Sequence, residues 1–183
     1  MTVPLQLDAG AIASGVNNVW VLVVCFLIFF MQPGFALLEA GQVRAKNVGN
    51  VLMKNMTDWT LGVLVFFIVG AGFSSIVGGL TSPGGFSVAG AFAYINDPTA
   101  YIGWFFGAVF AMTAATIVSG AVAGRMNFNA YVFVAAAMTA IIYPAVTGMT
   151  WAGGLLSGSG YIGQALGVGY LDFAGATVVH MVG

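Results

Sequence analysis

The sequence predicts an all-α, polytopic transmembrane helical bundle, and three observations lead to this class. Hydrophobic residues make up 60% of the 183 residues and charged residues only 5%, whereas a soluble domain carries roughly 25% charged residues. The apolar residues form long runs, close to the roughly 20 residues that a helix needs to cross a bilayer. These runs do not alternate between apolar and polar residues, as the strands of a membrane β-barrel would.

Four apolar runs predict complete membrane spans, and a fifth run continues to the last residue. The predicted helices cover residues 19–41, 59–80, 101–123, 128–147 and 170–183. The first run is too long for a cleavable signal peptide, and no basic residue precedes it. Pro33 and Pro144 fall inside two of the runs, where each removes a helical hydrogen bond. Because the fifth run is still apolar at Gly183, we expect residues 1–183 to be the N-terminal part of a longer membrane protein, with a natural five-span protein as the alternative.

The basic residues predict the orientation of the chain in the membrane. Arg44, Lys46 and Lys54 lie between the first two predicted spans, and Arg125 lies between the third and fourth. Cytoplasmic connections carry an excess of Lys and Arg. We therefore expect the N-terminus outside, and we expect Glu39, near the inner end of the first span, to pair with the basic connection that follows it.

Several functional classes are disfavoured by composition. A formal net charge of −1 without a basic cluster provides no footprint for nucleic acid. The single cysteine, Cys25, excludes a disulfide within the chain. The sequence has no Ser/His/Asp constellation, no metal-ligand spacing and no phosphate-binding loop, so we expect neither an enzyme nor a cofactor or metal site.

Two ionisable residues in the fifth run are candidate functional groups. His180 follows Asp172 by about 12 Å along a helix, which places it near the middle of the bilayer. A neutral imidazole can donate from one nitrogen and accept at the other, so His180 could handle a proton, although a packing role is an equal alternative. Asp172 could attract a cation at the outer mouth, but an N-terminal capping role is the favoured interpretation.

The outer ends of the third and fourth spans are rich in aromatic residues. Phe106 and Phe110 are four residues apart and share a helix face, and Trp151 follows the fourth span. Aromatic rings attract cations, but belts of Trp and Tyr also anchor membrane helices without binding a ligand. From these residues alone, the belt is the favoured interpretation.

Three segments resemble signatures of the ammonium transporter (Amt/Mep/Rh) family. Residues 29–47 (FFMQPGFALLEAGQVRAKN) resemble its first-helix signature, residues 114–128 (AATIVSGAVAGRMNF) its third, and residues 170–183 (YLDFAGATVVHMVG) its fifth. The resemblance implies an eleven-helix fold with an inverted repeat of five plus five helices and an outside N-terminus. Residues 1–183 would then form the first five-helix repeat. It also implies a homotrimer with one pore per subunit.

The resemblance also assigns roles to five residues. Phe106 and Phe110 match the stacked aromatic gate, and Trp151 matches the tryptophan of the outer recruitment site. Asp172 matches the acidic residue below that site, and His180 matches the first of the twin pore histidines.

The sequence departs from the family pattern at two positions. Gly124 stands where the family usually has an acidic residue, and Gly148 replaces a polar residue before Trp151. The first departure puts the local pairing of that connection in question, and neither removes a pore position.

The function implied by the resemblance is ammonium uptake across the cytoplasmic membrane. Ammonium would be recruited at the aromatic outer vestibule and deprotonated, and ammonia would pass along a histidine-lined hydrophobic pore. The resemblance also suggests a nitrogen-signalling protein as a cytoplasmic regulator. An ammonium sensor built on the same fold is the alternative, and a small membrane subunit of a complex is a third hypothesis.

Overall fold

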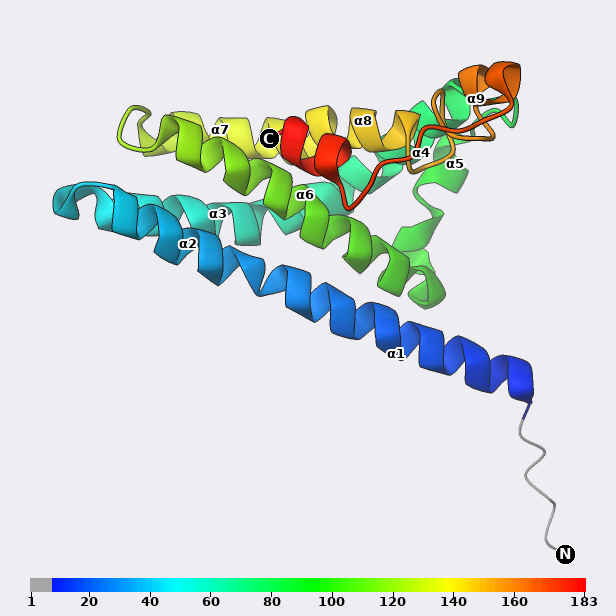
Figure 1. Cartoon of the computed structure of the whole chain (residues 1–183), viewed down its shortest axis with the longest axis horizontal. Coiled ribbons are helices and arrows are strands. Elements are labelled where there is room, and N and C mark those ends of the chain that lie inside the picture. The colour runs from blue at the N-terminus through cyan, green and yellow to red at the C-terminus, as the bar shows by residue number, and fades with distance from the viewer. Residues whose placement is uncertain (1–7) are drawn as a thin grey trace, which may run out of the picture.

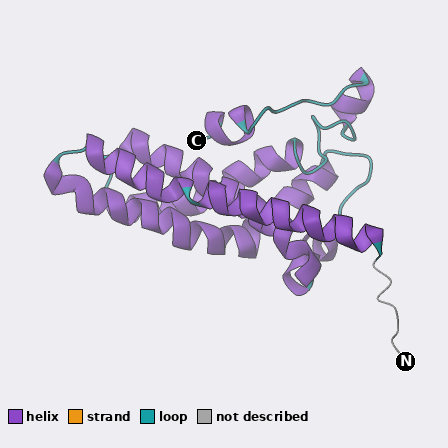
Figure 2. Ribbon diagram, turned by 60° about the horizontal axis from the view of Figure 1, so that its bottom comes forward, coloured by secondary structure: helices purple, strands orange, loops and turns teal. Residues whose placement is uncertain are grey.

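The computed structural model describes residues 8–183, and helices dominate this part of the chain (Figure 2). Within it, four helical segments are long and apolar enough to cross a membrane. They cover Ala9–Gln42, Ala45–Leu80, Pro98–Val122 and Phe128–Met149. The all-α class with several apolar spans is therefore confirmed. The five-helix repeat and the outside N-terminus stay predictions.

The first segment consists of α1 (Ala9–Phe29) and α2 (Met31–Gln42). It begins before the predicted residue 19, because Asp8 caps α1 by accepting a 2.9 Å hydrogen bond from the N–H of Gly10. The two helices are separated at Phe30, three residues before Pro33. Since proline has no N–H to donate to the carbonyl four residues earlier, the interruption lies where the sequence predicts one.

The second segment consists of η1 (Ala45–Asn47), α3 (Val48–Val65), the π-helical η2 (Phe66–Gly70) and α4 (Ala71–Leu80). It also begins well before the predicted residue 59. The placement of Lys54 in the connection between the first two spans is wrong, because Lys54 lies inside α3 and is completely buried. Hydropathy places the start of this span too late, because it treats each polar residue as exposed. Lys54, Asn55 and Asp58 are instead buried against neighbouring helices.

The third and fourth segments agree closely with the predicted residues 101–123 and 128–147. They consist of α6 (Tyr101–Val122), followed by α7 (Phe128–Ala137), the π-helical η5 (Met138–Ile142) and α8 (Tyr143–Met149). The π-helical turn directly precedes Pro144, where a helical hydrogen bond is missing. It meets η2 closely, since a Cβ atom added to Gly70 would lie 2.2 Å from the carbonyl oxygen of Thr139.

The centre of the bundle is α6, which contacts α1, α2, α3 and α7. Its middle is lined by small buried side chains, including Ala108, Ala111, Ala114 and Ala115. Small residues allow the backbones of membrane helices to approach closely. The position of α6 is therefore defined on several sides, and the residues at its two ends are held in fixed relation to the neighbouring helices.

The helices run back and forth between two ends of the molecule (Figure 1). The connections from α2 to α3 and from α6 to α7 lie together at one end, and these carry Arg44, Lys46 and Arg125. The start of α1, the short α5 (Val88–Ala91) and α9 (Tyr161–Leu166) lie toward the other end. Two further short turns, η3 (Ala93–Asn96) and η4 (Pro98–Ala100), lead into α6. The basic residues of the connections therefore mark one end of the bundle.

The predicted fifth helix, residues 170–183, is helical only over the π-helical η6 (Ala176–Met181). Ala174 and Gly175 precede it with left-handed backbone angles, at φ values of 54° and 73°. Residues 170–173 are not helical. The non-helical residues 170–173 therefore lead into a sharp turn at Ala174 and Gly175. After this turn, η6 packs against α6 and α8.

Candidate functional site

An aromatic cluster forms at the end of the bundle that lies opposite the basic connections. The rings of Phe106 and Phe110, on consecutive turns of α6, have centroids 5.0 Å apart. The ring centroid of Phe110 lies 5.6 Å from that of Trp151, with the planes at 71°. Phe106 and Trp151 remain 37% and 42% exposed. The structure thus brings together three of the residues that the sequence singles out, with ring surface open to a solute.

Trp151 is positioned by the turn that ends α8. The N–H of Ala152 donates to the carbonyl of Thr147 at 2.8 Å, and the N–H of Leu155 donates to the hydroxyl of Thr81 at 3.0 Å. This turn lies close against α4, because a Cβ atom on Gly78 would be 2.5 Å from the carbonyl oxygen of Ala152. The backbone turn that carries the indole is therefore fixed by hydrogen bonds and by its close approach to α4.

Asp172 holds the turn that precedes η6. Its Oδ1 accepts hydrogen bonds from the backbone N–H of Thr177 at 3.0 Å and from the Thr177 hydroxyl at 2.6 Å. Asp172 lies outside η6, whose N-cap is Gly175, so it accepts a backbone N–H of the first helical turn from the preceding turn and not as a residue of the helix itself. The turn lies against the indole, since a Cβ atom on Gly175 would be 3.6 Å from Cη2 of Trp151. Asp172 is therefore linked to the aromatic cluster through the turn that it stabilises.

His180 lies on η6, and its backbone N–H donates to the carbonyl of Gly175 at 3.0 Å. The preceding residues, Val178 and Val179, are buried against the core, whereas the side chain of His180 is exposed in the structure of this chain. His180 is thus directed away from the described helices, and its role in a pore stays a prediction.

A recess of about 380 Å³ adjoins the aromatic cluster between α4, α6 and α8. Phe106 and Trp151 line it, together with Tyr143, whose hydroxyl is buried and has no hydrogen-bond partner among the described residues. Ser74 and Thr147 add polar atoms and are hydrogen-bonded to each other at 2.9 Å. Sequence reasoning overlooked Tyr143, because a lone tyrosine in an apolar run resembles a packing residue.

A second group of polar residues is buried between α2, α3, α6 and α7, and we call it the inner polar cluster. Each member is at most 5% exposed. Its members are Gln32, Glu39, Lys54, Asn55, Asp58, Thr116, Ser119 and Tyr131. Ionisable groups within membrane-spanning helices are costly and usually functional. This cluster is therefore a second candidate site, remote from the aromatic rings.

Two hydrogen-bonded centres organise the inner polar cluster. Glu39 Oε2 accepts from the amide of Asn55 at 3.0 Å and from the hydroxyl of Ser119 at 2.8 Å. Asp58 Oδ2 and the hydroxyl oxygen of Tyr131 are hydrogen-bonded at 2.6 Å. Lys54 Nζ lies 5.1 Å from the centroid of the Tyr131 ring and has no hydrogen-bond partner among the described residues. In the structure the hydrogen bonds of the Glu39 carboxylate come from these uncharged donors and not from Arg44 or Lys46, the two basic residues that do lie in the connection.

The sequence contains a signal for this cluster that hydropathy hides. Val51, Lys54, Asn55 and Asp58 recur at the spacing of one helical face and are all buried. An amphipathic pattern of this kind, continuous with an apolar span, indicates a polar face turned toward neighbouring helices rather than toward water.

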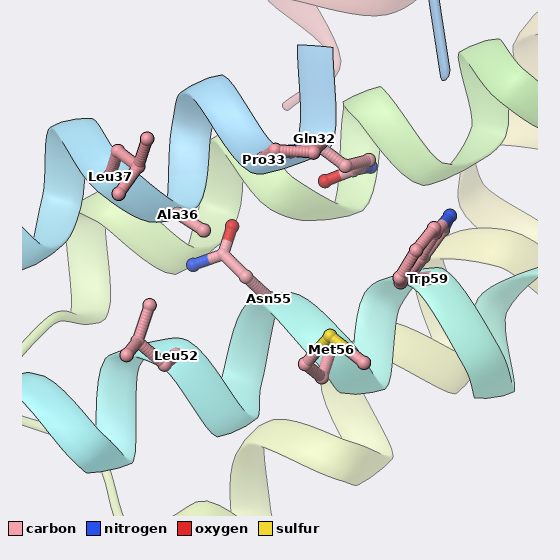
Figure 3. A pocket seen from close by; sticks show the side chains of 8 residues that line it. All are labelled: Gln32, Pro33, Ala36, Leu37, Leu52, Asn55, Met56 and Trp59. Atoms are coloured by element: carbon pink, nitrogen blue, oxygen red, sulfur yellow. The ribbon is translucent and has the colours of Figure 1, made fainter. Parts of the chain in front are cut away.

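The amides of Gln32 and Asn55 border a groove of about 410 Å³ between α2 and α3, which is shown in Figure 3. The other lining residues are Pro33, Ala36, Leu37, Leu52, Met56 and Trp59. The groove is almost entirely apolar apart from these amides and the indole nitrogen of Trp59. A layer of two amides therefore separates this groove from the ionisable groups of the inner polar cluster.

Residues 8–183 contain no group of three or more His, Cys, Asp or Glu side chains arranged to hold a metal ion.

Comparisons with known proteins show that this chain is similar to ammonium transporters. The model of the Ammonium Transporter Family matches residues 19–183. The chain is 77% identical over 181 residues to Ammonium transporter Amt1 of Haloferax mediterranei, and 53% identical over 188 residues to Ammonium transporter Amt2 of the same organism. It is also 40% identical over 185 residues to a putative ammonium transporter of Synechocystis.

These alignments cover 99%, 100% and 97% of this chain but 35%, 39% and 40% of the three relatives. The chain therefore spans between a third and two fifths of the length of these relatives. Their names are those of transporters, which agrees with the prediction that the chain is not an enzyme. Together with the four apolar spans, the family match indicates a multi-pass membrane protein. The chain belongs to the ammonium transporter family.

Proposed function

We propose that this chain forms the recruitment vestibule and the first part of the pore of a transporter that moves ammonium across the cytoplasmic membrane. The observation that carries the proposal is the contact between Phe110 and Trp151, whose ring centroids are 5.6 Å apart. Two aromatic faces beside a partly open recess suit a small cation. The names of the relatives support ammonium as that cation.

Recruitment and permeation require different chemistry. A cation over an aromatic ring gains about 0.5–2 kcal/mol, whereas transfer of a bare ion into an apolar medium costs tens of kcal/mol. The aromatic cluster can therefore concentrate ammonium at the outer end but cannot carry the charge through the membrane. Ammonium must lose its proton, and neutral ammonia then crosses the apolar passage.

His180 is the proposed proton-handling group of the passage. It follows the turn held by Asp172, which lies against Trp151, so the solute would meet the aromatic cluster first and the imidazole second. A neutral imidazole can both accept and donate a hydrogen bond. Asp172 would contribute by holding this turn and by adding a negative field near the recruited cation.

The assembly and orientation are part of the same proposal. The end that carries Arg44, Lys46 and Arg125 would face the cytoplasm, where a nitrogen-signalling regulator could dock, and the aromatic cluster would then face outward. Large apolar side chains such as Trp20, Phe26 and Leu27 are 60% or more exposed along α1. Lipid and the neighbouring subunits of a homotrimer would cover this surface.

The test is uptake of labelled methylammonium by proteoliposomes that contain the full-length protein. We expect saturable uptake that ammonium inhibits and that potassium does not, because potassium has no proton to release. Saturable binding without uptake would contradict the proposal and would favour the ammonium-sensor alternative. Uptake that potassium inhibits equally well would contradict the deprotonation step.

A further inference from the structure

Two hydroxyl groups of the inner polar cluster, those of Tyr131 and Thr116, make four contacts with other oxygen atoms, which is more than two hydroxyl hydrogens can bridge. The hydroxyl oxygen of Tyr131 lies 2.6 Å from Asp58 Oδ2 and 3.2 Å from the carbonyl oxygen of Ala115. The hydroxyl oxygen of Thr116 lies 2.6 Å from Gln32 Oε1 and 3.3 Å from Asp58 Oδ2. Each hydroxyl has one hydrogen to donate, so an ionised Asp58 leaves two hydrogens for four contacts.

A proton on Asp58 resolves this shortage. Protonated Oδ2 donates to the oxygen of Tyr131, and the hydroxyl of Tyr131 then donates to the carbonyl of Ala115. The hydroxyl of Thr116 is left to its shorter contact with Gln32. All three of the shorter contacts then have a hydrogen, and only the 3.3 Å approach of Thr116 to Asp58 lacks one.

Glu39 has a different environment, which requires it to accept. Its Oε2 receives the amide of Asn55, and the same amide nitrogen donates to the carbonyl of Val51 at 3.1 Å. An amide nitrogen donates only, so this bond cannot be reversed by a proton on Glu39 Oε2. The hydroxyl of Ser119 also donates to Oε2. Glu39 is therefore suited to the ionised form.

The charges of the cluster lead to the same assignment. Lys54 is its one cation, and Glu39 and Asp58 are its two carboxyl groups. One ammonium can compensate one carboxylate, and a second carboxylate would leave a net negative charge buried between membrane helices. Glu39 Oε1 and Asp58 Oδ1 are both buried and receive no hydrogen bond from the described residues, so the two carboxyl groups differ only at their other oxygens, where Glu39 Oε2 has two donors of fixed direction and Asp58 Oδ2 has none.

We propose that Asp58 is a proton-binding site, occupied at neutral pH, while the ammonium of Lys54 balances the charge of the ionised Glu39 within the cluster. The ionisable groups that face Asp58 are Glu39 from α2, Lys54 from α3 itself and Tyr131 from α7, and α6 contributes only hydroxyls. The site lies apart from the aromatic cluster and from His180, and it does not depend on the proposed transport.

Infrared spectroscopy of the gene-encoded protein in lipid vesicles tests this proposal, because a protonated carboxyl group has a carbonyl stretch distinct from carboxylate and amide bands. At neutral pH we expect one such band that shifts when aspartate is labelled with ¹³C in its side-chain carboxyl group. The band should disappear in Asp58→Asn and persist in Asp97→Asn, which removes an exposed carboxylate outside the spans. Absence of the band in the wild type, or its persistence in Asp58→Asn, would overturn the proposal.

Two further variants keep the test decisive if Asp58→Asn does not fold. Tyr131→Phe removes the oxygen that accepts the hydrogen bond from protonated Asp58, so the ¹³C-sensitive band should remain and change its frequency. Lys54→Met removes the compensating cation, so Glu39 should also bind a proton and the total band area should double. An unmoved band in Tyr131→Phe would overturn the assignment to Asp58, and an unchanged area in Lys54→Met would overturn the charge balance.

Discussion

The rings of Trp151 and Phe110 form a T-shaped pair, with centroids 5.6 Å apart and planes at 71°. One ring comes from the middle of a buried helix and the other from the turn that ends α8. Their contact therefore depends on the packing of α4, α6 and α8. It converts two separate aromatic residues into one surface that can attract a cation.

Replacement of Trp151 by leucine should weaken recruitment without abolishing transport. The loss of a cation–π contact of about 0.5–2 kcal/mol corresponds to a rise of roughly 2- to 30-fold in the KM of methylammonium uptake. Trp20→Leu is the matched control, because Trp20 is 67% exposed on α1 and lies outside the cluster. Equal KM values for the two variants would count against a recruiting role for Trp151.

His180→Ala should impair the proton-dependent step of transport. A positioned side chain contributes about 10²–10⁴-fold to a proton transfer, so uptake of methylammonium and the associated current should fall by roughly 10²-fold or more. Met181→Ala changes the next residue, which is 75% exposed, and should leave both quantities nearly unchanged. Wild-type uptake and selectivity in His180→Ala would refute the proton-handling role.

Tyr131→Phe should lower the stability of the folded protein, and this effect should be independent of transport activity. The variant removes a buried hydroxyl that lies within hydrogen-bond distance of Asp58 and Ala115. The cost of about 1–3 kcal/mol corresponds to a lowering of the melting temperature by roughly 2–10 °C. Tyr161→Phe, at a tyrosine that is 54% exposed, provides the control in the same thermal melt. A melting temperature as high as that of the control would be inconsistent with the bonding described for Tyr131.

Gly70→Ala should separate the two π-helical turns. The added Cβ would lie 2.2 Å from the carbonyl oxygen of Thr139 and 2.7 Å from the ring of Phe66. Overpacking of this kind costs about 1–3 kcal/mol, and the contact with backbone leaves little room for relief. The melting temperature in detergent should fall accordingly.

The control for Gly70→Ala is Gly34→Ala, since no heavy atom lies within 4 Å of a Cβ added to this helical glycine. That substitution should be neutral or stabilising by up to about 1 kcal/mol. Similar losses at both positions would mean that the close approach of Gly70 to Thr139 is not important for stability.

The helix boundaries predicted from the sequence were most accurate where the apolar run contains no charged residue. Residues 101–123 contain no charged residue, and the observed α6 ends within one residue of the prediction. The second span begins much earlier than residue 59, because Lys54 and Asp58 are polar but buried among partners. The fifth run contains Asp172 and His180, and the backbone angles at Ala174 and Gly175 delay its helix to Ala176.

Hydropathy and residue type were sufficient to identify a helical membrane protein, its apolar spans and the aromatic residues of interest, because these properties belong to single residues and short runs. The contact of Phe110 with Trp151 and the burial of Glu39, Lys54 and Asp58 required the three-dimensional arrangement. A polar side chain reads the same in a sequence whether it faces water or a hydrogen-bond partner on another helix. The free energy that distinguishes the two cases comes from residues distant along the chain, which only helix packing brings into contact.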